Sequence, residues 1–166
     1  MMNDLEKMTD RLEGEGVIVD ESILQHSPVN ISGLYIKASE CSPTILVNGS
    51  LSEREKRCVL AEEAGHHYRT VGNVIDAQDA FARKQEEAGR RWAYEELVPL
   101  DRLADICLEA EHLPLWDLAE ALDVTEGFLI TALNYYRDKY GCQTELPDGI
   151  IIQFEPYFDI YREDEN

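Results

Sequence analysis

The stretch Ser52–Thr70, SEREKRCVLAEEAGHHYRT, decides the fold, because it reads as one helix into which the preceding segments lead. It is rich in good helix formers, contains no Pro and has its only Gly near the end. Ser52 followed three residues later by Glu55 fits a capping box. The sequence therefore predicts that a long helix begins at Ser52.

Three residues of this helix form a pattern close to that of a zinc-peptidase helix. In the motif His-Glu-x-x-His, two metal ligands lie one turn apart, and the Glu takes a proton from metal-bound water. Here Glu62 stands where the first His is expected, followed by Glu63 and, four residues after Glu62, by His66. Pairing Glu63 with His67 would put Ala64 at the place of the proton acceptor, so only the Glu62 register is workable. Taken alone, the pair is weak evidence, because Glu–His pairs at this spacing are common on solvated helix faces.

Length and composition limit the class of protein. A chain of 166 residues forms one domain, or one domain with a small appendage. Its net charge of −19 is spread along the chain and repels phosphate backbones and anionic membranes, so we expect no nucleic-acid and no membrane partner. The four cysteines form no CxxC pair, the N-terminus lacks an apolar run, and nothing approaches 18 continuous apolar residues. These features predict a cytoplasmic protein with reduced thiols, and they leave the oligomeric state open.

Short strands are predicted before the helix. Asn3–Glu13 reads as a first helix and Gly16–Val19 as a short β-like run. Ile31–Ala38 and Pro43–Asn48 then read as two strands, with a turn at Ser39–Ser42 between them. A small sheet that leads into a metal-bearing helix is typical of metallopeptidases, because its edge strand can hold an extended substrate.

A second long helix is predicted from about Asp76 to Leu97, ending before Pro99. It contains KQEEAGRRWAYEELVP, a pattern of the form E-x-x-small-x-x-WA-x-x-x-L-x-P. Together with LAEEAGHH in the first helix, this pattern resembles the ImmA/IrrE family of metallopeptidases, with Gly89 in place of the usual Ala. The strands before these helices and the stretch DLAEALDVTEGFLITALNYYRDKYG after them look like the phage-type branch of that family, so the resemblance covers about Val17–Gly141.

The resemblance implies a fold and a site. The fold is α+β, with a small N-terminal antiparallel or mixed sheet packed on a zincin-like pair of metal-bearing helices. Glu62, His66 and Glu86 become the metal ligands and Glu63 the general base, while Glu87 is the third ligand if the register slips by one residue. The implied cofactor is zinc, although two carboxylates and one imidazole make a harder site that also suits Mn²⁺ or another divalent ion.

The implied function is that of a metal-dependent endopeptidase that cleaves a phage or mobile-element repressor, a helix–turn–helix regulator being the protein partner. The alternative is a catalytically weak or inactive family member that binds a repressor or another protein partner without cleaving it. Around the site, His67 is expected to have a structural or supporting role. Arg90 and Arg91 are expected to form ion pairs on the helix surface with Glu86 or Glu87.

The rest of the chain suggests a three-part division into a core (1–99), a helical helix–turn–helix-like region packed on it (100–141) and a C-terminal extended segment with an acidic tail (142–166). The second helix of the middle part gains basic residues only at Arg137 and Lys139. We therefore expect a structural or protein-binding role for it, and a DNA-binding regulator is a third interpretation. Ile150–Tyr161 is predicted to be extended, and it either joins the N-terminal sheet or contacts a partner.

Overall fold

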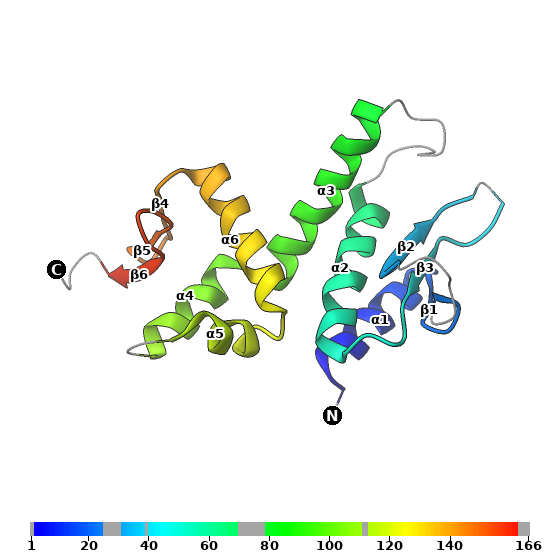
Figure 1. Cartoon of the computed structure of the whole chain (residues 1–166), viewed down its shortest axis with the longest axis horizontal. Coiled ribbons are helices and arrows are strands. Elements are labelled where there is room, and N and C mark those ends of the chain that lie inside the picture. Colours follow the sequence, from blue (N-terminus) through cyan, green and yellow to red (C-terminus); the bar gives the residue numbers. More distant parts are fainter. Residues whose placement is uncertain (1, 25–30, 39, 70–78, 111–112, 163–166) are drawn as a thin grey trace. The chain divides into compact units, whose positions relative to one another are not determined.

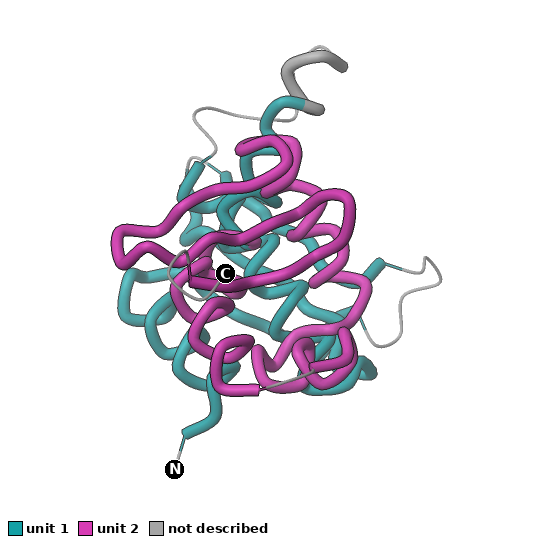
Figure 2. Tube along the Cα trace, turned by 90° about the vertical axis from the view of Figure 1, so that its left-hand side faces the viewer, with its two compact units in different colours: residues 1–93 teal, residues 94–166 magenta. Residues whose placement is uncertain are grey.

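The computed structural model describes residues 2–24, 31–38, 40–69, 79–110 and 113–162, with the side chains of residues 79–83 left out (Figure 1). The polar break expected at residues 71–73 and the expected helix start at Asp76 lie outside the described residues. Two compact units make up the chain, residues 1–93 and 94–166 (Figure 2). Helices and two small sheets occur together, which confirms the predicted α+β class.

The first unit contains a three-stranded mixed sheet. Its strands β1 (Ile18–Asp20), β2 (Gly33–Ile36) and β3 (Thr44–Val47) lie in the order β1-β3-β2. The central strand β3 runs parallel to β1 and antiparallel to β2. The central strand β3 has a neighbour on each side and packs against α2, and its last three residues are buried. The strand β2 forms an edge of the sheet.

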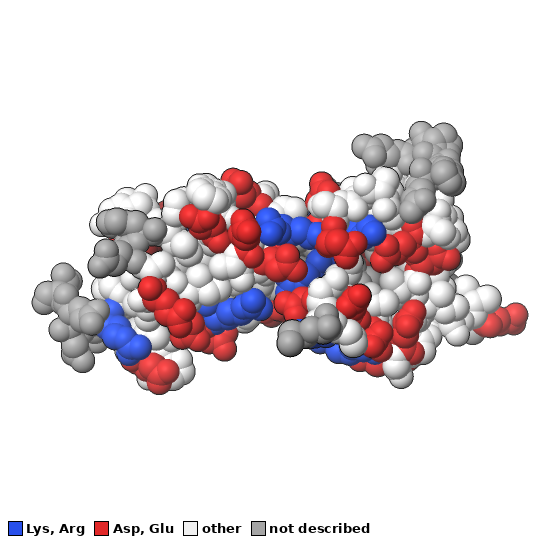
Figure 3. Space-filling model, turned by 90° about the horizontal axis from the view of Figure 1, so that it is seen from below, with Lys and Arg blue, Asp and Glu red and all other residues white. Residues whose placement is uncertain are grey.

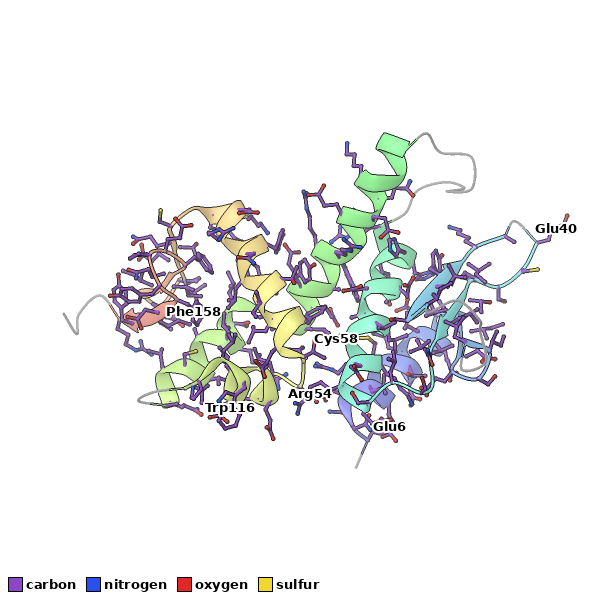
Figure 4. The ribbon with its side chains drawn as sticks, in the orientation of Figure 1. Glu6, Glu40, Arg54, Cys58, Trp116 and Phe158 are labelled. Carbon is purple, nitrogen blue, oxygen red and sulfur yellow. The ribbon has the colours of Figure 1, made fainter. Side chains whose placement is uncertain are left out.

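Two helices pack beside this sheet. The helix α1 (Asp4–Gly14) precedes it, and α2 (Glu53–Arg69) follows β3 and packs against β2, β3 and α1 (Figure 1). The predicted capping box is present: the N–H of Ser52 donates to Glu55 Oε2 at 2.9 Å, and the N–H of Glu55 donates to Ser52 Oγ at 3.3 Å. Cys58, labelled in Figure 4, belongs to the buried face of α2.

The helix α3 (Asp79–Leu97) is shared by the two units, since the boundary between them falls at residue 93. It ends at the predicted residue, two positions before Pro99, because the residue before a proline is disfavoured in the α-helical region. Its first-unit part carries Glu86 and Glu87, and its last turn lies in the second unit.

In the part of the second unit that the structure describes, three helices and a separate sheet follow the end of α3. The helices are α4 (Leu100–Glu109), α5 (Leu115–Ala121) and α6 (Glu126–Tyr140). The strands are β4 (Gln143–Glu145), β5 (Ile150–Gln153) and β6 (Asp159–Arg162). The large, fully buried side chains of this unit include those of Leu103, Leu118, Leu122, Leu129, Tyr136 and Ile152.

The C-terminal strands pair with one another in the antiparallel order β4-β5-β6, in a sheet separate from that of the first unit. The sequence had indicated one extended segment and left open that it joins the N-terminal sheet. The sequence did not predict the strand β4, because its three residues, QTE, are polar and mostly exposed. Gly149, with φ +69°, makes the turn that leads into β5.

Charged side chains are spread over the face of the protein that Figure 3 draws. Figure 3 shows acidic side chains in many places on the face in view, with Lys and Arg side chains among them. Within the described ranges, none of the helices combines the length and the apolar character that crossing a membrane requires.

A buried hydroxyl connects α6 to the end of α3. Tyr136 is 2% exposed, and its hydroxyl donates to the carbonyl of Val98 at 2.8 Å. We expect Tyr136→Phe to lower the free energy of unfolding by about 1 kcal/mol, because a buried carbonyl loses its donor. Urea denaturation measures this loss. Tyr157→Phe, at a residue that is 65% exposed, is the control and should change stability by less than about 0.5 kcal/mol. Equal changes in the free energy of unfolding for the two substitutions would contradict a stabilising role of the hydrogen bond from Tyr136 to Val98.

Candidate metal centre

The helices α2 and α3 touch backbone to backbone at two glycines. A Cβ atom placed on Gly65 would lie 2.1 Å from the carbonyl oxygen of Gly89, far inside van der Waals contact. A Cβ on Gly89 would in turn lie 2.9 Å from Nδ1 of His66. The absence of both side chains therefore lets the imidazole of His66 lie directly against α3.

This contact brings His66 to Glu86, which lies one turn before Gly89. The distance from His66 Nε2 to Glu86 Oε2 is 3.6 Å, and the His66 side chain is 14% exposed. Glu87 forms an ion pair with Arg91, one turn further along α3. Of the two candidates for the third ligand, the structure thus brings Glu86 next to His66.

Glu62 lies one turn before His66 on α2 and within electrostatic reach of the same groups. Burial raises the pKa of Glu62, the positive charge of Arg90 opposes the rise, and the negative charge of Glu86 adds to it. Burial lowers the pKa of His66, which Glu86 opposes and Arg90 reinforces. The three predicted ligands therefore share one electrostatic environment, with Arg90 as a cation within it.

The side chain of Glu63, which belongs to α2, lies beside the edge strand β2. A Cβ on Gly33 would be 2.4 Å from Cγ1 of Val59 and 3.0 Å from Cγ of Glu63, so β2 rests directly on this part of α2. Burial raises the pKa of Glu63 to about 7, the charges of Glu86 and Glu62 add to the rise, and a hydrogen bond from the backbone N–H of Tyr35 opposes it. A carboxyl group with such a pKa can both accept and release a proton near neutral pH.

A second contact between β2 and α2 had no signal in the sequence. The hydroxyl of Tyr35 lies 3.1 Å from Nδ1 of His67, and Nε2 of His67 lies 4.0 Å from a carboxylate oxygen of Glu15. His67 thus links α2 to β2 and to the end of α1, which agrees with the supporting role expected for it. The contact joins residues 32 positions apart, so neither the spacing nor the composition of either segment reveals it.

The donor atoms partly fit a divalent cation. Two ligand atoms of a tetrahedral ion with bonds of about 2.1 Å lie about 3.4 Å apart, close to the 3.6 Å between His66 Nε2 and Glu86 Oε2. Imidazole and carboxylate are also the ligand types that zinc and manganese accept. Among the described residues, however, no three His, Cys, Asp or Glu side chains form a complete metal-holding group. The structure therefore provides a pair of well-spaced donors, with Glu62 nearby but outside the pair.

Comparison with known proteins bears on this arrangement. The family model described as the IrrE N-terminal-like domain, peptidase family M78, matches residues 23–134 and thus includes α2 and α3. No curated protein and no solved structure matched the chain. The match covers about two thirds of the 166 residues and confirms the resemblance drawn from the two helix motifs. The protein therefore belongs to the M78 peptidase family of IrrE N-terminal-like domains.

Proposed function

We propose that the protein is a metal-dependent endopeptidase in which Glu62, His66 and Glu86 hold a divalent cation and Glu63 is the general base. The observation that carries the proposal is the 3.6 Å approach of His66 Nε2 and Glu86 Oε2 at the glycine crossing of α2 and α3. Glu63, half-buried, follows Glu62 on α2. Membership of a metallopeptidase family supports the same reading.

The cation would supply Lewis acidity, which polarises a peptide carbonyl and makes a water molecule more acidic. Glu63 accepts the proton of the attacking water at a carboxylate oxygen and returns it to the leaving amine. The backbone N–H of Tyr35 donates to this carboxylate and holds it in place. The edge strand β2, which rests on α2 beside Glu63, pairs with an extended substrate backbone and aligns it for attack.

The substrate we propose is a protein, and specifically a helix–turn–helix repressor of a phage or mobile element in the cytoplasm. This choice follows from the resemblance to the ImmA/IrrE family. Zinc is the cofactor we propose first, because the family resemblance implies it. Manganese is the alternative, because a site with two carboxylates and one imidazole is harder than one with two imidazoles.

A cleavage assay tests the proposal. The protein, freed of metal with a chelator, is incubated with such a repressor and with Zn²⁺ or Mn²⁺, and the products are identified by intact-mass spectrometry. We expect two complementary repressor fragments that appear only with metal and stop on renewed chelation. Intact repressor with each ion would contradict the proposal.

A second candidate function is binding of the partner without cleavage. Two observations favour it: Glu62 occupies the place of a histidine, and the described residues contain no complete group of three metal donors. In the same assay, a stable complex that survives gel filtration without fragments would identify this function.

A further inference from the structure

One carboxylate oxygen of Glu86 lies close to nitrogen atoms of two other side chains. Its Oε2 is 3.6 Å from Nε2 of His66 and 3.8 Å from a terminal nitrogen of Arg90. This is the same oxygen whose spacing from His66 suits a shared cation. The guanidinium of Arg90 therefore contacts the carboxylate that a metal ion would need.

Arg90 also affects the other donors of the site. Its positive charge lies close enough to Glu62 and His66 to act on both side chains. A divalent cation placed among these side chains would act on the same groups, with a larger charge. In its electrostatic effect, Arg90 thus resembles the ion that the site is proposed to bind.

The pair between Arg90 and Glu86 can open at little cost. At 3.8 Å it is longer than a hydrogen bond, and the two side chains are 57% and 56% exposed. Exposed ion pairs of this kind contribute little stability, so a cation that ligates Glu86 can displace the guanidinium.

We propose that Arg90 is an internal competitor of the metal ion, balancing the carboxylates of the metal-free site and weakening metal binding until its pair with Glu86 opens. This inference rests on the metal site proposed above and adds a residue that sets the affinity of that site. The physical reason is repulsion: a cation entering beside His66 meets the positive charge of Arg90.

The neighbouring pair on α3 offers a matched control. Arg91 and Glu87 form an ion pair with the same spacing of four residues, and their side chains are 52% and 63% exposed. Removing either arginine changes the net charge of the protein equally. Only Arg90, however, contacts the carboxylate that lies against His66.

The experiment is a calorimetric titration of the metal-free full chain with ZnCl₂ at constant pH and ionic strength. It compares the wild-type protein with Arg90→Gln, Arg90→Lys and Arg91→Gln. We expect Arg90→Gln to bind zinc about tenfold more tightly. Arg90→Lys, which keeps the charge, should remain within about threefold of wild type, and so should Arg91→Gln, whose charge is further away and screened. Thermal unfolding of each variant checks that the fold is intact.

The outcomes separate this inference from the proposed function. If wild type binds zinc and Arg90→Gln binds it equally or more weakly, Arg90 does not compete with the metal and the inference is overturned. Equal tightening by Arg91→Gln would also overturn it, because the effect would then be one of net charge. If neither wild type nor Arg90→Gln binds zinc, the metal site itself is wrong and both proposals fall. Binding by Arg90→Gln alone would support the competition in its strongest form.

Discussion

Gly65→Ala is expected to destabilise the first unit by about 3 kcal/mol, because the new methyl group would lie 2.1 Å from the carbonyl oxygen of Gly89. The atom that it meets belongs to the backbone of α3, so no side chain can rotate away to make room. The helices α2 and α3 must separate, and His66 then moves away from Glu86. We therefore expect a lower midpoint in urea denaturation, together with weaker metal binding by the folded protein.

Gly127→Ala is the matched control for this substitution. Gly127 is also helical, in the first turn of α6, and a Cβ there would meet nothing within 4 Å. Alanine is the better helix former, so this variant should be unchanged or more stable by up to about 1 kcal/mol. A loss of stability on Gly65→Ala, together with no loss or a gain on Gly127→Ala, would establish the close approach of α2 and α3 at Gly65 and Gly89. A neutral effect of Gly65→Ala would contradict it.

Glu63→Gln is expected to reduce the proposed peptide hydrolysis about 10³-fold, because an amide cannot accept the proton of the attacking water. Metal binding should persist, since Glu63 is not among the proposed ligands. The measurement is the initial rate of fragment formation by metal-loaded enzyme, with metal content determined on the same samples. Loss of the metal along with the activity would contradict the role of general base.

Glu87→Gln provides the charge-matched control for that variant. Glu87 lies on α3 and pairs with Arg91, so its replacement removes one negative charge without touching His66. We expect its rate of hydrolysis to stay within about threefold of wild type. A loss as large as that of Glu63→Gln would show that overall charge, rather than proton transfer, limits the reaction.

Local patterns in the sequence predict the elements of the first unit well. The capping box at Ser52 fixes the start of α2, and Pro99 limits α3, because both act through neighbouring residues. The register of strand pairing, in contrast, is not predicted by local sequence patterns. The parallel pairing of β1 with β3 joins Ile18 to Thr44, and the C-terminal sheet depends on pairing between short polar and apolar strands. Such pairings depend on long-range packing, which periodicity does not encode.

The same distinction applies to the candidate site. Helix periodicity alone places Glu62 and His66 on one face of α2. The approach of Glu86 depends on the crossing of two helices, and its sequence signal is a pair of glycines, Gly65 and Gly89. In the sequence, Gly89 stands out only because it replaces the Ala that is usual in the family, and this does not predict a close contact with α2. The pairing of Arg90 with Glu86 follows from their spacing of four residues, whereas its effect on His66 requires the packed structure. The predicted roles of the site residues and the three-part domain division stay predictions.

Metal stoichiometry tests the central claim most directly. The wild-type protein, His66→Ala, Glu86→Gln, Glu87→Gln and Arg90→Gln are dialysed against excess Zn²⁺ and then against metal-free buffer, and the zinc per chain is measured by elemental analysis. The account predicts one ion per chain in wild type and in Glu87→Gln, and loss of that ion in His66→Ala and Glu86→Gln. Zinc that is absent from both wild type and Arg90→Gln, or that is retained by Glu86→Gln and lost by Glu87→Gln, would contradict it.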